Sequence, residues 1–451
     1  MLVYYFVMSW QRTGTYFAAD DMMNLGNYFR LGPARALASQ FLPWKGYYRP
    51  AGAAFYLPLY HWFGLNPAPF QFTIMLLVAL NAVLLFRLAV HLGAPNLIAG
   101  LAAFVVAYHA GLTNLQYNID MVYDVLCFTF FIAALLYYVR IRRRGLPLCW
   151  QEAAVFLLLY LCAVNSKEMA LTMPLVLASY EWCYRMPRER WLKLTVLSAA
   201  IAAVSLYGKK FGIDPLIEKP AYHPVISLRR FLDFQQGSLH DLFAHCATFS
   251  VAGVLILWAV VTYLAWRRNR PLLRFAWAWM LLTTLPIAFL ADRFQGCLYL
   301  PLAGWAIFAA TIFVDLAHAG AAALANEPLF HRLGRNGTLA LLIASGVLIW
   351  VNQMRYLRTA ELRPAAAAQG TLTADVIGQL RALHPRVAPH SQVVFLNDPF
   401  TDWDMTFIGL LYFGDRGVQI YNQNKEHLSG DDLARMDHVF DFRDGKLVQL
   451  R

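Results

Sequence analysis

The chain has 451 residues and a net charge of +11, and 59% of its residues are hydrophobic while only 14% are charged. About a quarter of the residues in a soluble protein are charged, so this composition excludes an ordinary soluble enzyme. The positive charge does not indicate nucleic-acid binding, because the basic residues fall in short clusters between apolar runs and form no single patch.

The apolar residues form runs of about 18–22 residues between short polar or Pro-containing loops, a pattern typical of membrane-spanning helices. The first run, residues 1–12, is short: at about 1.5 Å per residue it reaches about 18 Å, and a bilayer core is about 30 Å thick. It has neither the basic start nor the small-residue cleavage site of a signal peptide. We therefore expect a first membrane helix whose beginning is missing.

Residues 13–68 are too polar and too rich in Gly and Pro to span a membrane. Within them, 22–31 and 53–63 have helix-like apolar spacing, which predicts short helices on the membrane surface. Asp20 and Asp21 stand side by side at the start of this first loop. Adjacent carboxylates at a bilayer edge are costly unless they face water, a cation or a substrate. The structural alternative is that they cap the first helix of the loop, because Asp favours helix N-termini.

Ten further apolar runs follow, which makes about eleven predicted spans in all. They cover residues 69–90, 96–112, 121–139, 149–164, 169–184, 191–207, 244–266, 272–290, 298–317 and 338–353. Every second connection carries a basic cluster, at 140–144, 185–193, 267–274 and 332–335. Because positively charged loops stay on the cytoplasmic side, we expect a multi-pass protein of the inner (plasma) membrane with its N-terminus inside.

This orientation collects charged residues from distant loops on the outer, periplasmic side. They are Asp20, Asp21, Arg49, Asp120, Lys167, Glu168, the segment 209–230, Asp292 and Arg293. Unrelated loops would distribute such groups over both faces, so their common side indicates a functional site there.

The composition changes near residue 355, which predicts a membrane domain at 1–354 and a small α/β domain at 355–451 on the outer face. Its expected elements are helical stretches at 353–363 and 373–383, a strand at 393–397 and a hairpin at 439–450 around Asp444-Gly445. Asp402 and Asp404 flank Trp403 and are able to contact a glycan, although acidic loop residues are usually only solvated.

Several short motifs now stand in order along the predicted outer side. They are Asp20-Asp21, Tyr48-Arg49-Pro50, Ser166-Lys167-Glu168, Asp292-Arg293-Phe294 and Leu298-Tyr299-Leu300-Pro301. In these motifs, over most of residues 1–355, the chain resembles the GT-C membrane glycosyltransferases, and within them the protein O-mannosyltransferase-like branch. That branch includes transmembrane O-mannosyltransferases with tetratricopeptide repeats, which are not seen in this sequence. The chain departs from relatives at Asp292, where they often have Glu, and at Gln295-Gly296-Cys297, which interrupts a usually tighter run.

The resemblance implies an all-α polytopic fold for the membrane domain, next to the small C-terminal α/β domain predicted from composition. It also implies transfer of a mannose-like sugar from a polyprenyl-phosphate donor to a protein, lipid or glycan acceptor at the outer face. Asp20 or Asp21 then matches the general base, and either helps to hold a divalent cation such as Mg²⁺ or Mn²⁺. We expect the donor phosphate to be bound by Arg49, Arg293 and Lys167. The expected supporting residues are Glu168, Asp292, Tyr299 and Tyr48.

Each of these roles has a structural alternative. Arg at a membrane edge often reaches to lipid headgroups, and adjacent Lys167 and Glu168 are expected to pair and close a tight hairpin. Tyr47, Tyr48, Tyr56 and Tyr60 fit an interfacial aromatic belt better than a sugar platform, and His61 fits an interfacial position. The six cysteines show no metal-site spacing, although a bridge between Cys246 and Cys297 is conceivable.

Two other functions compete with glycosyl transfer. A transporter or flippase for a lipid-linked sugar predicts charged or broken segments near mid-bilayer, whereas the charges here lie at the ends of the spans. A non-catalytic scaffold that binds a partner through its tail predicts no dependence on Asp20, Asp21 or Arg293.

Overall fold

A computed structural model describes residues 15–451 except 113–117, 146–148, 187–191, 214, 291–292, 325–326, 329 and 427. The short first span predicted at residues 1–12 and the predicted supporting residue Asp292 lie outside the described residues.

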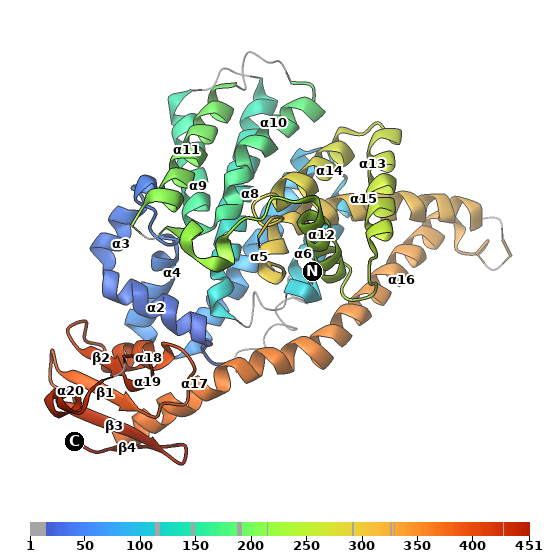
Figure 1. Cartoon of the computed structure of the whole chain (residues 1–451). Helices are drawn as coiled ribbons and strands as arrows, with labels where there is room; N and C mark the ends of the chain where they lie inside the picture. Colours follow the sequence, from blue (N-terminus) through green and yellow to red (C-terminus); the bar gives the residue numbers. More distant parts are fainter. Residues whose placement is uncertain are drawn as a thin grey trace.

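Most of the described chain is helical, and every predicted span after the first corresponds to a helix (Figure 1). The helices are α5 Pro67–His91, α6 Asn96–Tyr108, α8 Val122–Arg144, α9 Trp150–Ser166, α10 Met173–Cys183, α11 Leu192–Phe211, α13 Val251–Arg267, α14 Pro271–Thr284, α15 Tyr299–Leu324 and α16 Gly334–Leu357. Within the described ranges, five helices are long and apolar enough to cross a membrane. They are Pro67–His91, Ile119–Arg144, Lys193–Phe211, Gly296–Leu324 and Gly334–Ala360.

The bundle is built around α8, which packs against α5 and α9, and around α15, which packs against α6 and α14. The seam between α8 and α15 is aromatic, because Phe128 and Tyr299 stack with ring centroids 4.2 Å apart. At the other end of α8, Arg142 donates to both oxygens of Glu181 on α10, over 2.8 and 2.9 Å. Two parallel bonds to one carboxylate fix both distance and orientation, so this pair holds α8 and α10 in register.

The first loop folds as α2 Ala19–Leu31, α3 Pro33–Ser39, the 3₁₀ turn η1 Pro43–Lys45 and α4 Gly52–Phe63. The helices predicted at 22–31 and 53–63 are confirmed, whereas α3 was not predicted. Helix α2 begins where it does because Asp21, in its first turn, accepts a hydrogen bond from the backbone N–H of Ala18 over 2.7 Å.

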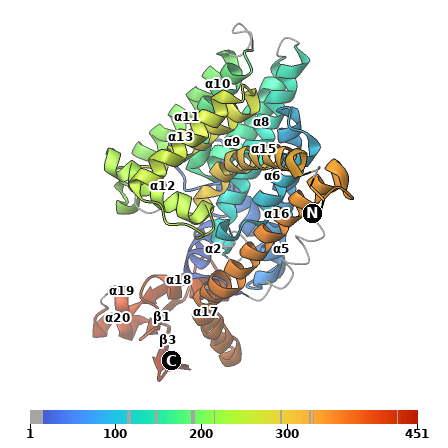
Figure 2. The same cartoon turned by 90° about the vertical axis from the view of Figure 1, so that its right-hand side faces the viewer.

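The chain passes from α16 into α17 Arg363–Leu383 through a π-helical turn at Arg358–Leu362, so the boundary predicted at 354 lies inside a continuous helical rod (Figure 2). The stretches predicted at 353–363 and 373–383 are parts of this rod, and the division into two domains stays a prediction.

Beyond the rod, a four-stranded sheet has the order β2-β1-β3-β4. Its strands are β1 Gln392–Leu396, β2 Gln419–Asn422, β3 His438–Arg443 and β4 Lys446–Gln449. Strand β1 is parallel to both neighbours, and β3 and β4 form the predicted antiparallel hairpin. Asp444 and Gly445 have φ of 50° and 75°, as a tight two-residue hairpin turn requires.

Helix α18, Asp404–Phe413, joins the sheet to the first loop by packing on α2. Gly26 of α2 lies against the ring of Phe407. A Cβ added at position 26 would be 2.7 Å from that ring, so only glycine fits. Arg416 donates to the carbonyl of Phe29 over 2.7 Å, and Tyr60 to that of Leu411 over 2.5 Å. The C-terminal sheet is therefore fixed against the helix that carries Asp20 and Asp21.

Two native cysteines test the expected orientation of the bundle. Cys149 and Cys246 are both exposed. Cys149 lies at the end of the bundle that holds the last turn of α8, and Cys246 lies at the end that holds its first turn. We expect Cys149 to react with a membrane-impermeant maleimide only from the cytoplasmic side and Cys246 only from the opposite side. Buried Cys127 and Cys183 serve as internal controls that stay unlabelled without denaturant. The reverse labelling pattern would contradict the orientation.

Candidate active site

A cavity of about 1230 Å³ opens at the end of the bundle where α8 begins. Its walls come from α2, the segment after η1, the turn before α8, the turn between α9 and α10, the end of α11, the connection between α11 and α12 Leu228–Leu242, and the connection between α14 and α15. Part of the wall is apolar, formed by Leu171, Leu206, Leu216, Pro286, Ile287, Leu290 and Phe294. The remaining wall carries charged and tyrosine side chains from segments far apart in sequence.

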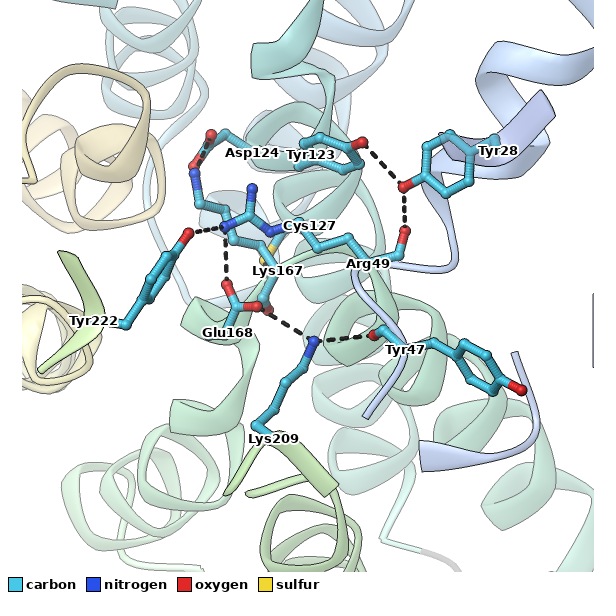
Figure 3. Close-up of polar contacts among 10 residues, drawn as sticks. All are labelled: Tyr28, Tyr47, Arg49, Tyr123, Asp124, Cys127, Lys167, Glu168, Lys209 and Tyr222. Carbon is cyan, nitrogen blue, oxygen red and sulfur yellow. Dashed lines mark hydrogen bonds and ion pairs between the residues drawn. The ribbon is translucent and has the colours of Figure 1, made fainter. Parts of the chain in front are cut away.

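Two ion-pair groups form one side of the cavity (Figure 3). Glu168 accepts from Arg49 over 3.2 Å and lies 3.5 Å from the ammonium of Lys209. Burial alone would raise the pKa of Glu168, but Arg49 and Lys209 outweigh burial and hold that pKa well below its ordinary value. In the second group Lys167 pairs with Asp124, and both side chains are almost fully buried.

Arg49 is held in place by backbone geometry. The turn before it approaches α11 so closely that a Cβ on Gly208 would lie 2.2 Å from the carbonyl oxygen of Pro43. Arg49 itself adopts a φ of 38°, in the left-handed region that residues with a Cβ rarely occupy. Its carbonyl accepts a hydrogen bond from the Tyr28 hydroxyl over 2.7 Å. The guanidinium therefore projects into the cavity from a fixed position.

Tyrosine rings surround the cations on this side. The Arg49 guanidinium lies 4.7 Å from the ring centroid of Tyr48 and donates to the Tyr222 hydroxyl over 3.2 Å. Arg293 lies 4.4 Å from the ring centroid of Tyr222, and Lys219 lies 5.6 Å from that of Tyr48. Aromatic faces attract cations, so these rings orient several positive groups toward one cavity. We call Arg49, Lys167, Lys209, Lys219 and Arg293 the basic wall.

Acidic side chains also line the cavity, and the two adjacent aspartates of the first loop lie in different environments. Asp20 is exposed and lines the cavity, as does Asp120. Asp21 is fully buried and accepts from the backbone N–H of Ala18 and, over 2.5 Å, of Asp120. Burial raises the pKa of Asp21 well above its ordinary value, and the nearby Asp120 carboxylate raises it further. Asp21 therefore caps helix α2, as the structural alternative predicts. Asp20 remains on the cavity wall, where a bound molecule can reach it.

The structure also places the remaining predicted residues. Tyr48, Arg49, Lys167, Glu168 and Arg293 all line the cavity. The described cavity wall does not include Tyr299, which is buried against Phe128.

Three structural expectations are wrong. Lys167 and Glu168 do not pair with each other, because Lys167 has an extended backbone (φ −161°, ψ 151°) that sends consecutive side chains to opposite sides. Tyr56 is fully buried in the core, so it is not part of an interfacial belt. The conceivable bridge between Cys246 and Cys297 is absent, since both are free thiols.

Four residues that line the cavity were not predicted as site residues from the sequence: Asp124, Lys219, Tyr222 and Asn24. Asp120 was predicted to lie on the outer side, but with no role. Asp120 and Asp124 are four residues apart at the start of a helix, a spacing that puts both on one face and was visible in the sequence. The part of the chain that the structure describes contains no group of three His, Cys, Asp or Glu side chains able to hold a metal ion. The predicted divalent cation stays a prediction, and no step below depends on it.

Comparison with known proteins agrees with the fold. No protein-family model and no curated protein sequence matches the chain. Two solved structures are similar at 13% identity and a TM-score of 0.51. One is the apo oligosaccharyltransferase from Archaeoglobus fulgidus, over 95% of this chain, which spans 64% of the length of that enzyme. The other is ArnT from Cupriavidus metallidurans bound to undecaprenyl phosphate, over 99% of this chain and 90% of that one. The chain has the fold of GT-C membrane proteins.

The buried pair of Lys167 and Asp124 yields a stability prediction. Removing one partner leaves an uncompensated buried charge, so we expect Lys167→Met or Asp124→Asn to cost about 3–5 kcal/mol of unfolding free energy. The double variant is expected to lose much less than the sum, because no charge is left unpaired. Thermal unfolding in detergent measures both effects, and additive losses would contradict the pairing.

The pKa of Glu168 yields a prediction on pH. Because this pKa is lowered on folding, the stabilisation by the carboxylate is complete above its ordinary value of 4.5 and declines as the pH falls further. We expect Glu168→Gln to lower the unfolding temperature by a constant amount between pH 8 and pH 5, and by a smaller amount at pH 3.5. A difference that grows on acidification would contradict the ion pairs with Arg49 and Lys209.

Proposed function

We propose that the chain is a polyprenyl-phosphate-dependent glycosyltransferase in which Asp20 is the general base. The observation that carries this proposal is the presence of both signs of charge in one cavity, which is lined by the basic wall and also by Asp20 and Asp120. A transferase of this type must neutralise a departing phosphate and accept a proton from the attacking hydroxyl, two requirements of opposite sign.

The basic wall suits the donor. Arginine binds phosphate oxygens through two parallel hydrogen bonds, and Arg49 and Arg293 line the same cavity from separate loops. The apolar part of the wall, including Leu206, Leu290 and Phe294, offers a surface for an isoprenoid chain next to those cations. The similarity to ArnT, whose structure holds undecaprenyl phosphate, supports a donor of that class.

The proposed reaction is one displacement at the anomeric carbon. The oxygen of the acceptor hydroxyl forms a bond to this carbon, and the bond from the carbon to the phosphate oxygen breaks. The polyprenyl phosphate leaves with the electron pair and is stabilised by the basic wall. The hydroxyl proton passes to the carboxylate of Asp20. Asp21 positions Asp20 by fixing the first turn of α2 to the backbone of Asp120.

From the sequence we further propose a mannose-like sugar, membership of the O-mannosyltransferase branch, and an active site on the periplasmic side. A transporter or flippase has less support, because the charges gather at the end of the bundle around a cavity. A scaffold gives no reason for six basic side chains, those of the basic wall and Lys210, to line one cavity.

Substitution of the two aspartates tests the base assignment. We expect Asp20→Asn to reduce transfer from a polyprenyl-phosphate hexose by about 10²–10⁴-fold, because the proton acceptor is lost, with an unchanged unfolding temperature. Asp21→Ala is expected to destabilise the protein by about 1–3 kcal/mol, since it removes a helix cap and two accepted hydrogen bonds. Full transfer by Asp20→Asn would refute the assignment of Asp20 as the base. If Asp20→Asn lost stability and Asp21→Ala did not, the roles of base and helix cap would be exchanged between the two residues.

A further inference from the structure

Helix α2 presents a stripe of hydrogen-bonding groups to the cavity. Asp20, Asn24 and Asn27 are spaced four and three residues apart, and all three line the cavity. This spacing places them on one helix face, above one another. None of them is a cation, and together they offer one carboxylate and two carboxamides.

Two acceptor oxygens, one in this stripe and one from Asp120, lack a hydrogen-bond donor within the described ranges. Asn24 is only 4% exposed, and its Oδ1 finds no hydrogen-bond partner among the described residues. The same holds for Oδ1 of Asp120, in the part of the chain that the structure describes. A buried acceptor without a donor costs about 1–3 kcal/mol, so such atoms in a cavity wall indicate a ligand that donates. Hydroxyl groups donate, whereas phosphate oxygens at neutral pH only accept.

We propose that Asp20, Asn24, Asn27 and Asp120 form the acceptor subsite, and that the acceptor is an uncharged, hydroxyl-rich sugar or glycan. This inference rests on the function proposed above and specifies its second substrate. Carboxylate and carboxamide oxygens receive hydrogen bonds from several hydroxyls at once, and the Asp20 carboxylate repels a phosphorylated acceptor.

The loop after β1 extends this subsite outward. Strand β1 has parallel neighbours on both sides, and in such sheets ligands bind beyond the carboxyl end of the strand where the order reverses. Here that position is residues 397–403, which lead into α18 on α2. Because α18 packs on α2, this loop lies beside the helix that carries Asp20. Trp403, 43% exposed, offers a ring face on which a sugar can stack.

The test uses the purified full chain, a radiolabelled undecaprenyl-phosphate hexose and three acceptor fractions from the envelope of the source cells. The fractions are phosphate-free glycan, phosphorylated lipid A and protein. We expect label to enter the phosphate-free glycan. We also expect Asn24→Ala, Asn27→Ala and Trp403→Ala each to raise the half-saturating glycan concentration at least tenfold, with undecaprenyl phosphate binding unchanged within twofold. Because Asn27 and Trp403 are exposed, those two variants remain informative if Asn24→Ala does not fold.

Asn96→Ala, at the exposed start of α6 on the opposite end of the bundle, is the matched control and should change neither constant. Arg293→Gln should show the reverse pattern, with weaker undecaprenyl phosphate binding and an unchanged glycan requirement. Transfer only to lipid A or only to protein would overturn the acceptor inference and leave the proposed function standing. Equal glycan requirements in the wild type and the α2 variants would also overturn it. Absence of transfer to every fraction by wild type would instead refute the proposed function, and the inference with it.

Discussion

The site depends on one largely buried carboxylate that has two cationic partners. Glu168, whose side chain is 21% exposed, binds Arg49 from the first loop and lies beside Lys209 at the end of α11, so it joins three segments that are distant in sequence. A carboxylate with so little access to water is tolerable only when it is paired, and here pairing also brings two cations to one cavity. The ring of Tyr48 lies against Arg49 and that of Tyr222 against Arg293, so aromatic faces help to hold two cations of the basic wall.

The spans were predictable because an apolar run of membrane length has few alternatives to a helix, and α5 and α8 lie close to their predicted ranges. The gathering of polar groups at one end was also predictable, since it follows from the order of the spans and the basic clusters. Which charges pair was not predictable. Lys167 and Glu168 are neighbours in sequence, but an extended backbone turns them apart, and each finds a partner in another segment.

The same limit applies to Asp20 and Asp21. The sequence supports both capping and catalysis for the pair, and neighbouring residues at a helix start point in directions about 100° apart. In the structure one carboxylate therefore turns to the backbone of the preceding turn, while the other turns to the cavity. Capping is observed for Asp21, and the catalytic role of Asp20 stays a proposal. Predicting this division requires the position of Asp120, which comes from the next part of the bundle.

The presence of both signs of charge in one cavity has a consequence for the direction of the proposed reaction. Fixed charges of opposite sign create an electric field between them, and the low dielectric of the surrounding helices weakens that field little. In the proposed transfer, negative charge moves from the attacking oxygen toward the phosphate, and a field between Asp20 and the basic wall favours movement of negative charge toward the cations. The folded chain thereby holds, before any substrate arrives, fixed charges that favour this displacement.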